Sequence, residues 1–531
     1  MEIIKQFLKT YFMKNFKYPL NQILFLVFSL HLVAQNKAGD DLFTGLTVHT
    51  INIQSSLPLE VFWDSLIYYK DQANLNGGDD TYMKVDITID NVTTYDIGVH
   101  LKGNSSYSAP NSGYKKSFKL DFDKYIDGQD YDGLDKLNLN NCIGDPSMMR
   151  EKLTLDLFNN MGLPSPRATF ANIYLNDTLW GLYSVCEIVE GTFLKNRFGE
   201  KDGNLFKGDN SGHLIWEDNN QSSYYGDYEL ENNDSLNDWS DLVHLLDIIN
   251  NTSDNDFEDS LETVLNIDVA LKYWSICNLL VNLDSYLGSG HNYYIYHNTL
   301  TDKFEWIPWD VNESIGGFSM NGMPTTIDEM YNMAYDFLPT GTGTERPLYE
   351  RILNNTNLTK QYTDALHELI VDYVNADTWN PKIDSIADVI RPYIYADSNF
   401  FYPSSDFEKN IDTVVDGAPG LKLFIKERTS YYDSVLVSMG YPSYIDEKEN
   451  NKNNILIFPN PANTSINIQS NNTPTKLILY NYLGEEAQQN EWKNYSGIIN
   501  IDISHLPSGI YSCIINKNDS CISSGKIAVI H

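Results

Sequence analysis

The segment Trp306-Ile307-Pro308-Trp309-Asp310-Val311-Asn312 places a carboxylate directly behind an apolar strand. Burying such a group is costly unless a metal ion or a hydrogen-bond network satisfies it. Upstream, Asp284 follows an apolar helix and Asn292 stands at the start of a strand. A catalytic base, a metal-binding amide and a metal-binding carboxylate require these residue types, so we expect the three side chains to converge at one cleft. For Asp310 taken alone, a purely structural acid bonded to the backbone is the alternative.

The order of secondary structure around this stretch predicts an α+β domain with two lobes, covering residues 36–443. Period-two alternation predicts strands, and apolar spacing near 3.6 residues predicts helices. Strands are predicted at residues 83–90, 95–101, 117–122, 168–175, 181–188, 293–297 and 304–309. Helices are predicted at residues 64–70 and 146–158, and within 237–283 and 347–440.

Two features in the first half of the chain can bind phosphate groups. The loop Lys102-Gly103-Asn104-Ser105 follows a strand, and a small loop with glycine can bring backbone N–H groups close to phosphates. Lys116 and Lys119 enter the next strand, where one of them can reach the α- and β-phosphates of a nucleotide. A plain hairpin loop and solvated edge-strand charges are the alternatives.

Arg150 and Glu151 lie at a predicted helix start, close to Asp145 and Ser147. Glu151 can pair with the phosphate-binding lysine, and Arg150 can contact phosphate directly. Ordinary capping of the helix by Asp145 or Ser147, with a favourable acid in the first turn, explains the same residues equally well. The sequence leaves both explanations open.

The N-terminus has the features of a secretory signal peptide, which we predict at residues 1–35. Lys14 and Lys17 precede the apolar run 23–30, and Val33-Ala34-Gln35 provides an exit that contains a small residue. The apolar run is too short for a transmembrane helix, and no other segment reaches that length. We therefore expect an exported protein with no transmembrane segment in its mature form.

The charge of the chain excludes one class of partner. It has 37 basic and 72 acidic residues among 531, which gives a formal net charge of −35. Such a surface repels nucleic acid and anionic membranes, so we expect no nucleic-acid partner.

A polar linker at residues 444–454 leads to a C-terminal region of different character. From residue 455 to 531, short strands recur with turn residues between them, which predicts a small all-β sandwich. This region resembles the C-terminal sorting domain of the type IX secretion system in Bacteroidetes. The resemblance rests on Phe458-Pro459-Asn460-Pro461-Ala462, Tyr482-Leu483-Gly484 and Leu506-Pro507-Ser508-Gly509-Ile510-Tyr511. It implies the type IX secretion machinery as a partner, and a protein exported through the periplasm that is secreted or held at the cell surface.

The larger part of the chain, from about residue 40 to 440, resembles the CotH (spore coat protein H) kinase-like family. Six motifs carry the resemblance in the family's order: Lys102 through Ser106, Asp145 through Arg150, Gly181-Leu182-Tyr183 with Glu187, Asn282 with Asp284, His291 through Tyr296, and Ile307 through Asp310. Two positions depart from the family. Lys102 stands where Arg is frequent, and Val311-Asn312 stands where a second Asp is common.

The resemblance implies an atypical protein-kinase-like fold that binds ATP and Mg²⁺. Asp284 would be the catalytic acid or base, Asp310 the Mg²⁺ ligand and Asn292 a supporting metal or phosphate contact. Lys116 or Lys119 would be the nucleotide lysine. The expected function is transfer of the γ-phosphoryl group of ATP to Ser or Thr hydroxyls of a protein substrate. Nucleotidyl transfer on the same scaffold and a non-catalytic adhesion role at the cell surface are the alternatives.

Overall fold

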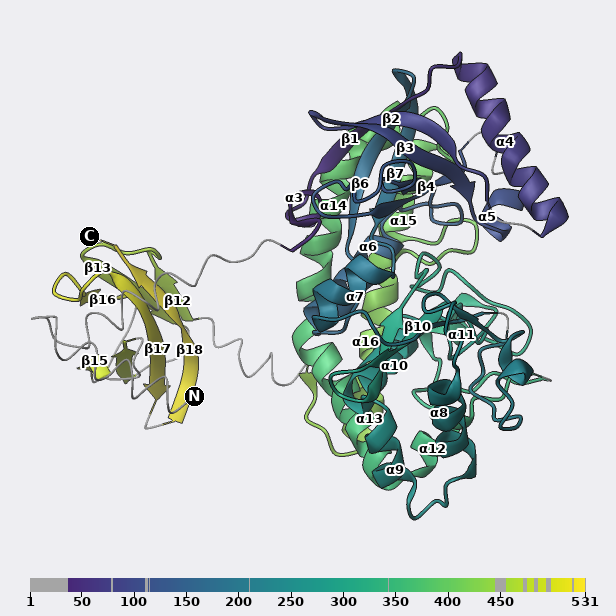
Figure 1. Cartoon of the computed structure of the whole chain (residues 1–531). Coiled ribbons are helices and arrows are strands. Elements are labelled where there is room, and N and C mark those ends of the chain that lie inside the picture. Colours follow the sequence, from purple (N-terminus) through teal and green to yellow (C-terminus); the bar gives the residue numbers. More distant parts are fainter. Residues whose placement is uncertain are drawn as a thin grey trace, which may run out of the picture. The chain divides into compact units, whose positions relative to one another are not determined.

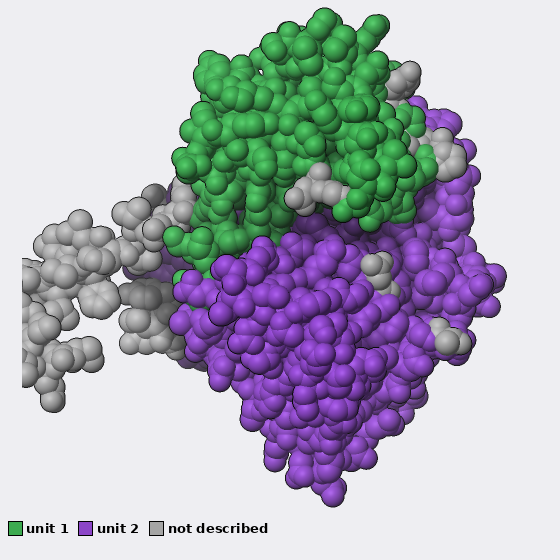
Figure 2. All heavy atoms as spheres, turned by 45° about the vertical axis from the view of Figure 1, so that its right-hand side comes forward, with its two compact units in different colours: residues 1–141, 168–201, 397–399 green, residues 142–167, 202–396, 400–531 purple. Residues whose placement is uncertain are grey.

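The computed structural model describes most of the chain between residues 37 and 530 (Figure 1). The described residues are 37–77, 80–109, 113, 115–209, 211–341, 343–444, 455–470, 475–481, 486–492, 498–517 and 520–530. The predicted signal peptide and nearly all of the predicted linker lie outside them. The chain divides into two compact units, coloured in Figure 2: residues 1–141, 168–201 and 397–399 form unit 1, and residues 142–167, 202–396 and 400–531 form unit 2.

Unit 1 is built around a closed β-barrel with strand order β1-β2-β3-β4-β5-β7-β6. The strands are β1 Val48–Gln54, β2 Met83–Ile89, β3 Val92–Lys102, β4 Ser117–Asp121, β5 Lys136–Asn140, β6 Ala168–Leu175 and β7 Thr178–Cys186. β1 closes the barrel by pairing in parallel with β6, from Val48 opposite Phe170 onward, while the other neighbours are antiparallel. Alternate residues point inward, so Ile51, Ile87 and Leu120 are among the buried side chains of the core.

Helix α4 Leu59–Asn76 packs against β3 of the barrel (Figure 1). It buries Phe62, Trp63 and Leu66 and leaves Tyr68 and Leu75 exposed. The shorter helices of unit 1 are α3 Asp40–Phe43, α5 Ser105–Ser108 and α7 Gly191–Phe198. The sequence predicted only residues 64–70 as helix, because the exposed apolar residues blur the amphipathic pattern.

A buried ion pair connects Lys115, just before β4, with Asp397 in the segment 397–399. Lys115 Nζ lies 2.5 Å from Asp397 Oδ2, with side-chain exposures of 1% and 0%. Asp397 also accepts hydrogen bonds from the backbone N–H groups of Leu182 and Asn399, at 3.0 and 2.8 Å. Gly181 has φ +139°, and a Cβ atom there would lie 2.5 Å from both carboxylate oxygens of Asp397. Only glycine therefore allows the carboxylate to approach β7 this closely.

Unit 2 contains a small antiparallel sheet with strand order β11-β10-β8-β9 and many helices. The strands are β8 Leu205–Gly208, β9 Tyr228–Leu230, β10 Tyr293–Asn298 and β11 Lys303–Pro308. The helices are α6 Arg150–Asn160, α8 Ser240–Asn251, α9 Phe257–Val264, α10 Ile267–Leu279, α11 Ile327–Tyr331, α12 Pro347–Asn354, α13 Thr356–Glu368, α14 Ala376–Ala396, α15 Ser404–Asp412 and α16 Leu421–Ser438. The α+β class is confirmed; the kinase-like arrangement of two lobes stays a prediction.

The predicted helix at residues 146–158 begins later than expected, at Arg150. Asp145 explains the difference, because its carboxylate accepts hydrogen bonds from the backbone N–H groups of Ser147 and Arg150, both at 2.9 Å. These bonds form a capped turn in front of the helix. Asp145 thus stabilises the turn before α6, whose N-cap residue is Met149.

The C-terminal region from Ile455 onward is all-β within the residues that the structure describes. Two antiparallel sheets have strand orders β12-β13-β16 and β15-β14-β17-β18. The strands are β12 Ile455–Phe458, β13 Ser465–Ser470, β14 Lys476–Tyr480, β15 Glu486–Glu491, β16 Ile498–Asp502, β17 Gly509–Lys517 and β18 Ser520–Val529. Both sheets contribute to one apolar core, for example Ile466 and Ile468 from β13 and Leu477 and Leu479 from β14. The all-β prediction for this region is confirmed.

We predict that Lys115→Met lowers the free energy of unfolding by about 3–5 kcal/mol, because it leaves the buried Asp397 carboxylate without its cation. Lys84→Met is the matched control in unit 1, since Lys84 and Asp96 pair at 3.4 Å with side chains that are half exposed. That change should cost at most about 1 kcal/mol. Urea denaturation of the full chain measures both, and equal losses in the two variants would contradict the importance assigned to the buried pair.

Candidate active site in unit 2

The loop between α10 and β10 carries Asp284, and the β10–β11 hairpin brings a second acid to the same region. In the hairpin, Tyr293 pairs with Pro308 and Asn298 pairs with Lys303. The start of β10 is therefore adjacent to the end of β11, and Asn292 and Asp310 flank the same end of the hairpin. The register explains how residues 18 positions apart in sequence come to the same end of the hairpin.

Three side chains fix the carboxylate of Asp284. Ser289 Oγ donates to Oδ1 at 3.0 Å, and His291 Nε2 lies 3.0 Å from the same oxygen. Asn292 Nδ2 donates to Oδ2 at 2.8 Å and also to the backbone carbonyl of Asp284 at 3.1 Å. Asp284 is partly buried, and these charge-assisted hydrogen bonds hold its carboxylate in one orientation. Asn292, predicted as a metal or phosphate contact, here positions Asp284.

The carboxylates of this region act strongly on one another. Burial, followed by the charges of Asp284 and Asp310, raises the pKa of Glu313 from its ordinary value of 4.5 to about 8. Burial lowers the pKa of His291, but the hydrogen bond and charge of Asp284, with the charges of Asp209 and Asp310, raise it above its ordinary value overall. Shifts of this kind from burial and like charges are typical of functional sites. We call Asp209, Asp284, His291, Asp310 and Glu313 the acidic cluster.

Backbone strain surrounds the acidic cluster. Four residues other than glycine have positive φ: Val281 at 48°, Asn292 at 58°, Asp310 at 47° and Ile315 at 57°. This conformation is uncommon for Asn and Asp and is a genuine outlier for the β-branched Val and Ile. Strained backbone persists only where its surroundings enforce it, and it collects at active sites.

The described residues contain no preformed group of three or more His, Cys, Asp or Glu side chains arranged to hold a metal ion. The acidic cluster nevertheless offers carboxylate oxygens, the ligand type that Mg²⁺ prefers. The pKa of Glu313 is raised first by burial and then by the charges of Asp284 and Asp310, so anionic groups lie close together in this region.

In unit 1, the predicted phosphate-binding residues lie at the end of β3, in the loop that follows it, and at or within β4. Lys102 Nζ donates to Asn140 Oδ1 at 3.0 Å, and Gly103 has φ +100°, which suits the turn that leads through Asn104 into α5 at Ser105. Lys116 Nζ donates to the backbone carbonyl of Tyr107 at 2.6 Å. Burial lowers the pKa of Lys116.

Lys119 lies in the middle of β4, opposite His100 of β3 and Asn138 of β5, and is less buried than Lys116. Its greater exposure therefore favours Lys119 over Lys116 as the lysine that a ligand can reach. Either assignment as the nucleotide lysine stays a prediction.

Arg150 and Glu151 are both buried in the first turn of α6. The guanidinium of Arg150 donates to Asp145 Oδ1 at 2.5 Å, to Asn410 Oδ1 at 2.9 Å and to the carbonyl of Pro419 at 2.6 Å. These contacts bind α6 to the segment after α15 within unit 2. A phosphate contact for Arg150 and a lysine contact for Glu151 stay predictions, and the arrangement around Arg150 favours a structural role.

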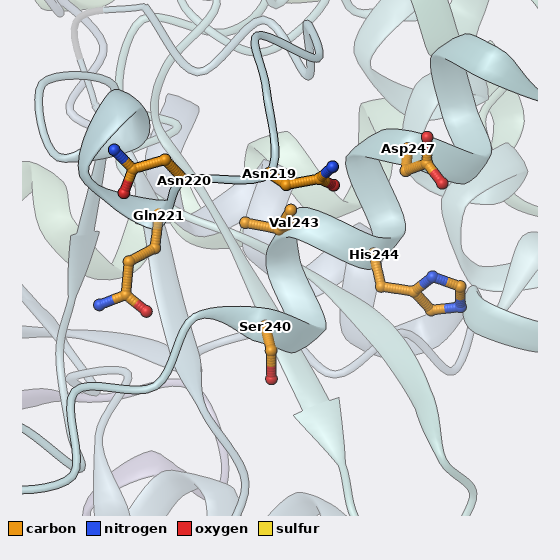
Figure 3. A pocket seen from close by; sticks show the side chains of 7 residues that line it. All are labelled: Asn219, Asn220, Gln221, Ser240, Val243, His244 and Asp247. Atoms are coloured by element: carbon orange, nitrogen blue, oxygen red, sulfur yellow. The ribbon is translucent and has the colours of Figure 1, made fainter.

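A pocket in unit 2 contains none of the residues predicted for the site. Figure 3 shows this pocket, about 450 Å³ in volume, beside the first turns of α8. Its lining is mostly polar and comprises Asn219, Asn220, Gln221, Ser240, Val243, His244 and Asp247. The lining has no basic side chain other than the imidazole, so it offers no match for nucleotide phosphates.

Comparison with known proteins identifies the class to which this arrangement belongs. Residues 99–432, more than half of the chain, match the CotH kinase protein family, and the chain belongs to that family. It is 26% identical over 331 residues to the inner spore coat protein H of Bacillus subtilis (strain 168), across 60% of this chain and 82% of that protein. The motifs from Lys102 through Asp310 all fall within the matched range.

The C-terminal region matches a second family. Residues 456–530 match the secretion system C-terminal sorting domain, which marks the chain for export to the cell surface or for secretion. Among the helices of the described residues, none is long and apolar enough to cross a membrane. The predicted localisation is thereby confirmed.

Sequence reasoning missed Asp209, Ser289 and Glu313 as members of this region. Asp209 follows the short strand β8, which was not predicted. Ser289 lies within a turn-rich loop where many small residues occur. A signal for Glu313 did exist, since it is the next acid after Asp310 in a segment already singled out.

We predict that the metal-free protein loses stability as the pH rises from about 5 to about 8. The folded state keeps Glu313 protonated up to a pKa of about 8, whereas the unfolded chain releases this proton near 4.5, so the folded state binds more protons between these values. Glu313→Gln should remove this part of the pH dependence. Thermal denaturation in a chelator measures it, with the exposed Glu262→Gln as control; unchanged curves for Glu313→Gln would contradict the raised pKa.

Proposed function

We propose that this chain is a Mg²⁺-dependent protein kinase that transfers the γ-phosphoryl group of ATP to Ser or Thr hydroxyls of an exported or surface protein. Membership of the CotH kinase family supports the class of reaction. The observation that carries the proposal is the Asp284 carboxylate, held by Ser289, His291 and Asn292 near the carboxyl groups of Asp310 and Glu313.

Asp284 suits the role of general base. Its carboxylate accepts the proton as the substrate hydroxyl oxygen forms a bond to the γ-phosphorus, the bond from that phosphorus to the bridging oxygen breaks, and ADP leaves. The three donors that orient Asp284 fix the direction from which a hydroxyl can approach, and positioning of this kind supplies much of phosphoryl-transfer catalysis.

Asp310 and Glu313 suit the role of metal ligands, with Asn292 as the positioning amide. Bound Mg²⁺ would neutralise charge on the phosphate oxygens. A bound cation would also offset the charges of Asp284 and Asp310, which add to burial in raising the pKa of Glu313, and this gives the acidic cluster a physical reason to favour a divalent cation. The loop Lys102–Ser105 and Lys116 or Lys119 are proposed for the nucleotide phosphates.

The test is intact-mass spectrometry of the full chain after incubation with ATP and Mg²⁺, with a Ser/Thr-containing acceptor protein present. We predict a phosphate-sized mass gain on the chain or the acceptor, reduced by about 100-fold or more in rate in Asp284→Asn, as expected for loss of a general base. Asp310→Ala should be equally impaired. Asp302→Asn is the control, because Asp302 lies in the β10–β11 turn with a side chain that is 93% exposed.

Each other outcome points to a different function. An AMP-sized gain that depends on Asp310 would replace the kinase with a nucleotidyl transferase on the same scaffold. No gain, together with no thermal stabilisation by ATP and Mg²⁺, would contradict an enzymatic role and favour a non-catalytic adhesion protein at the cell surface.

A further inference from the structure

A buried arginine, Arg346, donates hydrogen bonds to the backbone of the loop that carries Asp284. Arg346, at the N-terminus of α12, is 1% exposed. Its Nε and Nη2 atoms donate to the backbone carbonyls of Tyr286 and Gly288. Nη1 donates to the carbonyl of Glu345 at 2.7 Å. The planar guanidinium thus bridges the backbone carbonyls of Tyr286 and Gly288, which lie two and four residues after Asp284.

The contacts of Arg346 are unusual for a buried cation. The side-chain hydrogen bonds that the structure describes for it all go to backbone carbonyl oxygens, and burial lowers the pKa of this guanidinium. The ring of Tyr286 and the charges of Glu345 and Glu350 favour the cation, but removing a charge from water costs several kcal/mol. A buried arginine with no carboxylate hydrogen bond to its guanidinium among the described residues is therefore a poor way to gain stability. A residue of this kind is better explained by the geometry that it imposes.

The loop itself is built to admit the guanidinium. A Cβ atom on Gly290, whose φ is +81°, would clash with the ring of His213 and would lie 3.2 Å from Arg346 Nη2. A Cβ atom on Gly288 would clash with the carbonyl of Leu283. The turn between Asp284 and His291 is therefore compact, with glycines at the positions where Arg346 approaches.

A second buried arginine offers a comparison that separates loop geometry from stability. Arg428 in α16 is fully buried and donates to the carbonyls of Asn278 and Leu279 at 2.9 and 3.0 Å. It binds the C-terminal end of α10, where a cation is favoured by the helix dipole. It also donates to the carbonyls of Tyr331 and Met333, at 3.0 and 2.8 Å, so its contacts lie outside the loop, whereas two of those of Arg346 lie within it.

We propose that Arg346 is a positioning residue for the reaction. By binding the carbonyls of Tyr286 and Gly288, it keeps Asp284 within hydrogen-bond distance of Ser289 and His291. The inference rests on the proposed function for its catalytic consequence. Lysine cannot replace arginine here, because an ammonium group lacks the planar fork that reaches two carbonyls at once.

The test compares Arg346→Lys with Arg428→Lys in the full chain, by hydrogen–deuterium exchange and by the kinetics of phosphoryl transfer. For Arg346→Lys we expect faster exchange of amides 284–292 and a fall in kcat of about 10- to 100-fold with KM for ATP near the wild-type value, since a small misplacement of a catalytic group costs rate more than binding. Arg428→Lys should show faster exchange at the end of α10 with kcat near the wild-type value.

Three results would overturn the inference: unchanged exchange of amides 284–292 in Arg346→Lys, equal losses of kcat in both variants, or a loss confined to KM. If the wild-type chain transfers no phosphoryl group, the proposed function fails on its own account. Hydrogen exchange then tests whether Arg346 holds the loop. If amides 284–292 are equally protected in the wild type and in Arg346→Lys, the inference is rejected.

Discussion

Burial of carboxyl groups close to one another is the constraint on which the candidate site depends. Burial, and then the charges of Asp284 and Asp310, raises the pKa of Glu313 to about 8. Three donors orient the Asp284 carboxylate, and Arg346 binds the loop that carries it. Strained residues at Val281, Asn292, Asp310 and Ile315 belong to the same segments. Concentrating like charges and strain in one place lowers stability, so the arrangement is best explained by what it binds.

Much of the fold follows from local sequence patterns, and what escaped prediction is set by distant contacts. Strand β6 was predicted at its observed bounds, Ala168–Leu175, and β10 and β11 within one residue, because each alternates or forms a short apolar run between turns. Closure of the barrel was not predicted, since it requires β1 to pair in parallel with β6, a contact across more than a hundred residues. The short strands β8 and β9 carry too few residues for a period to emerge.

The candidate site likewise contains some residues that the sequence predicted and others that only distant contacts reveal. Asp284, Asn292 and Asp310 could be picked out because each follows or precedes an apolar element, and the structure brings Asn292 onto Asp284 at 2.8 Å. Arg346 could not, because its role arises from contacts to backbone carbonyls 60 and 58 residues away. Lys115 was passed over for Lys116 and Lys119, since a run of lysines does not reveal which one meets a buried acid; here Asp397 selects Lys115.

If the acidic cluster is a metal site for nucleotide chemistry, it should bind Mn²⁺ together with a nucleotide. Anomalous X-ray diffraction from crystals soaked with Mn²⁺ and a non-hydrolysable ATP analogue measures this. We predict a manganese peak bound by Asp310, with Glu313 or Asp284 among its neighbours and nucleotide phosphate oxygens in the same coordination shell. A metal and nucleotide bound elsewhere, with these carboxylates free of both, would contradict it.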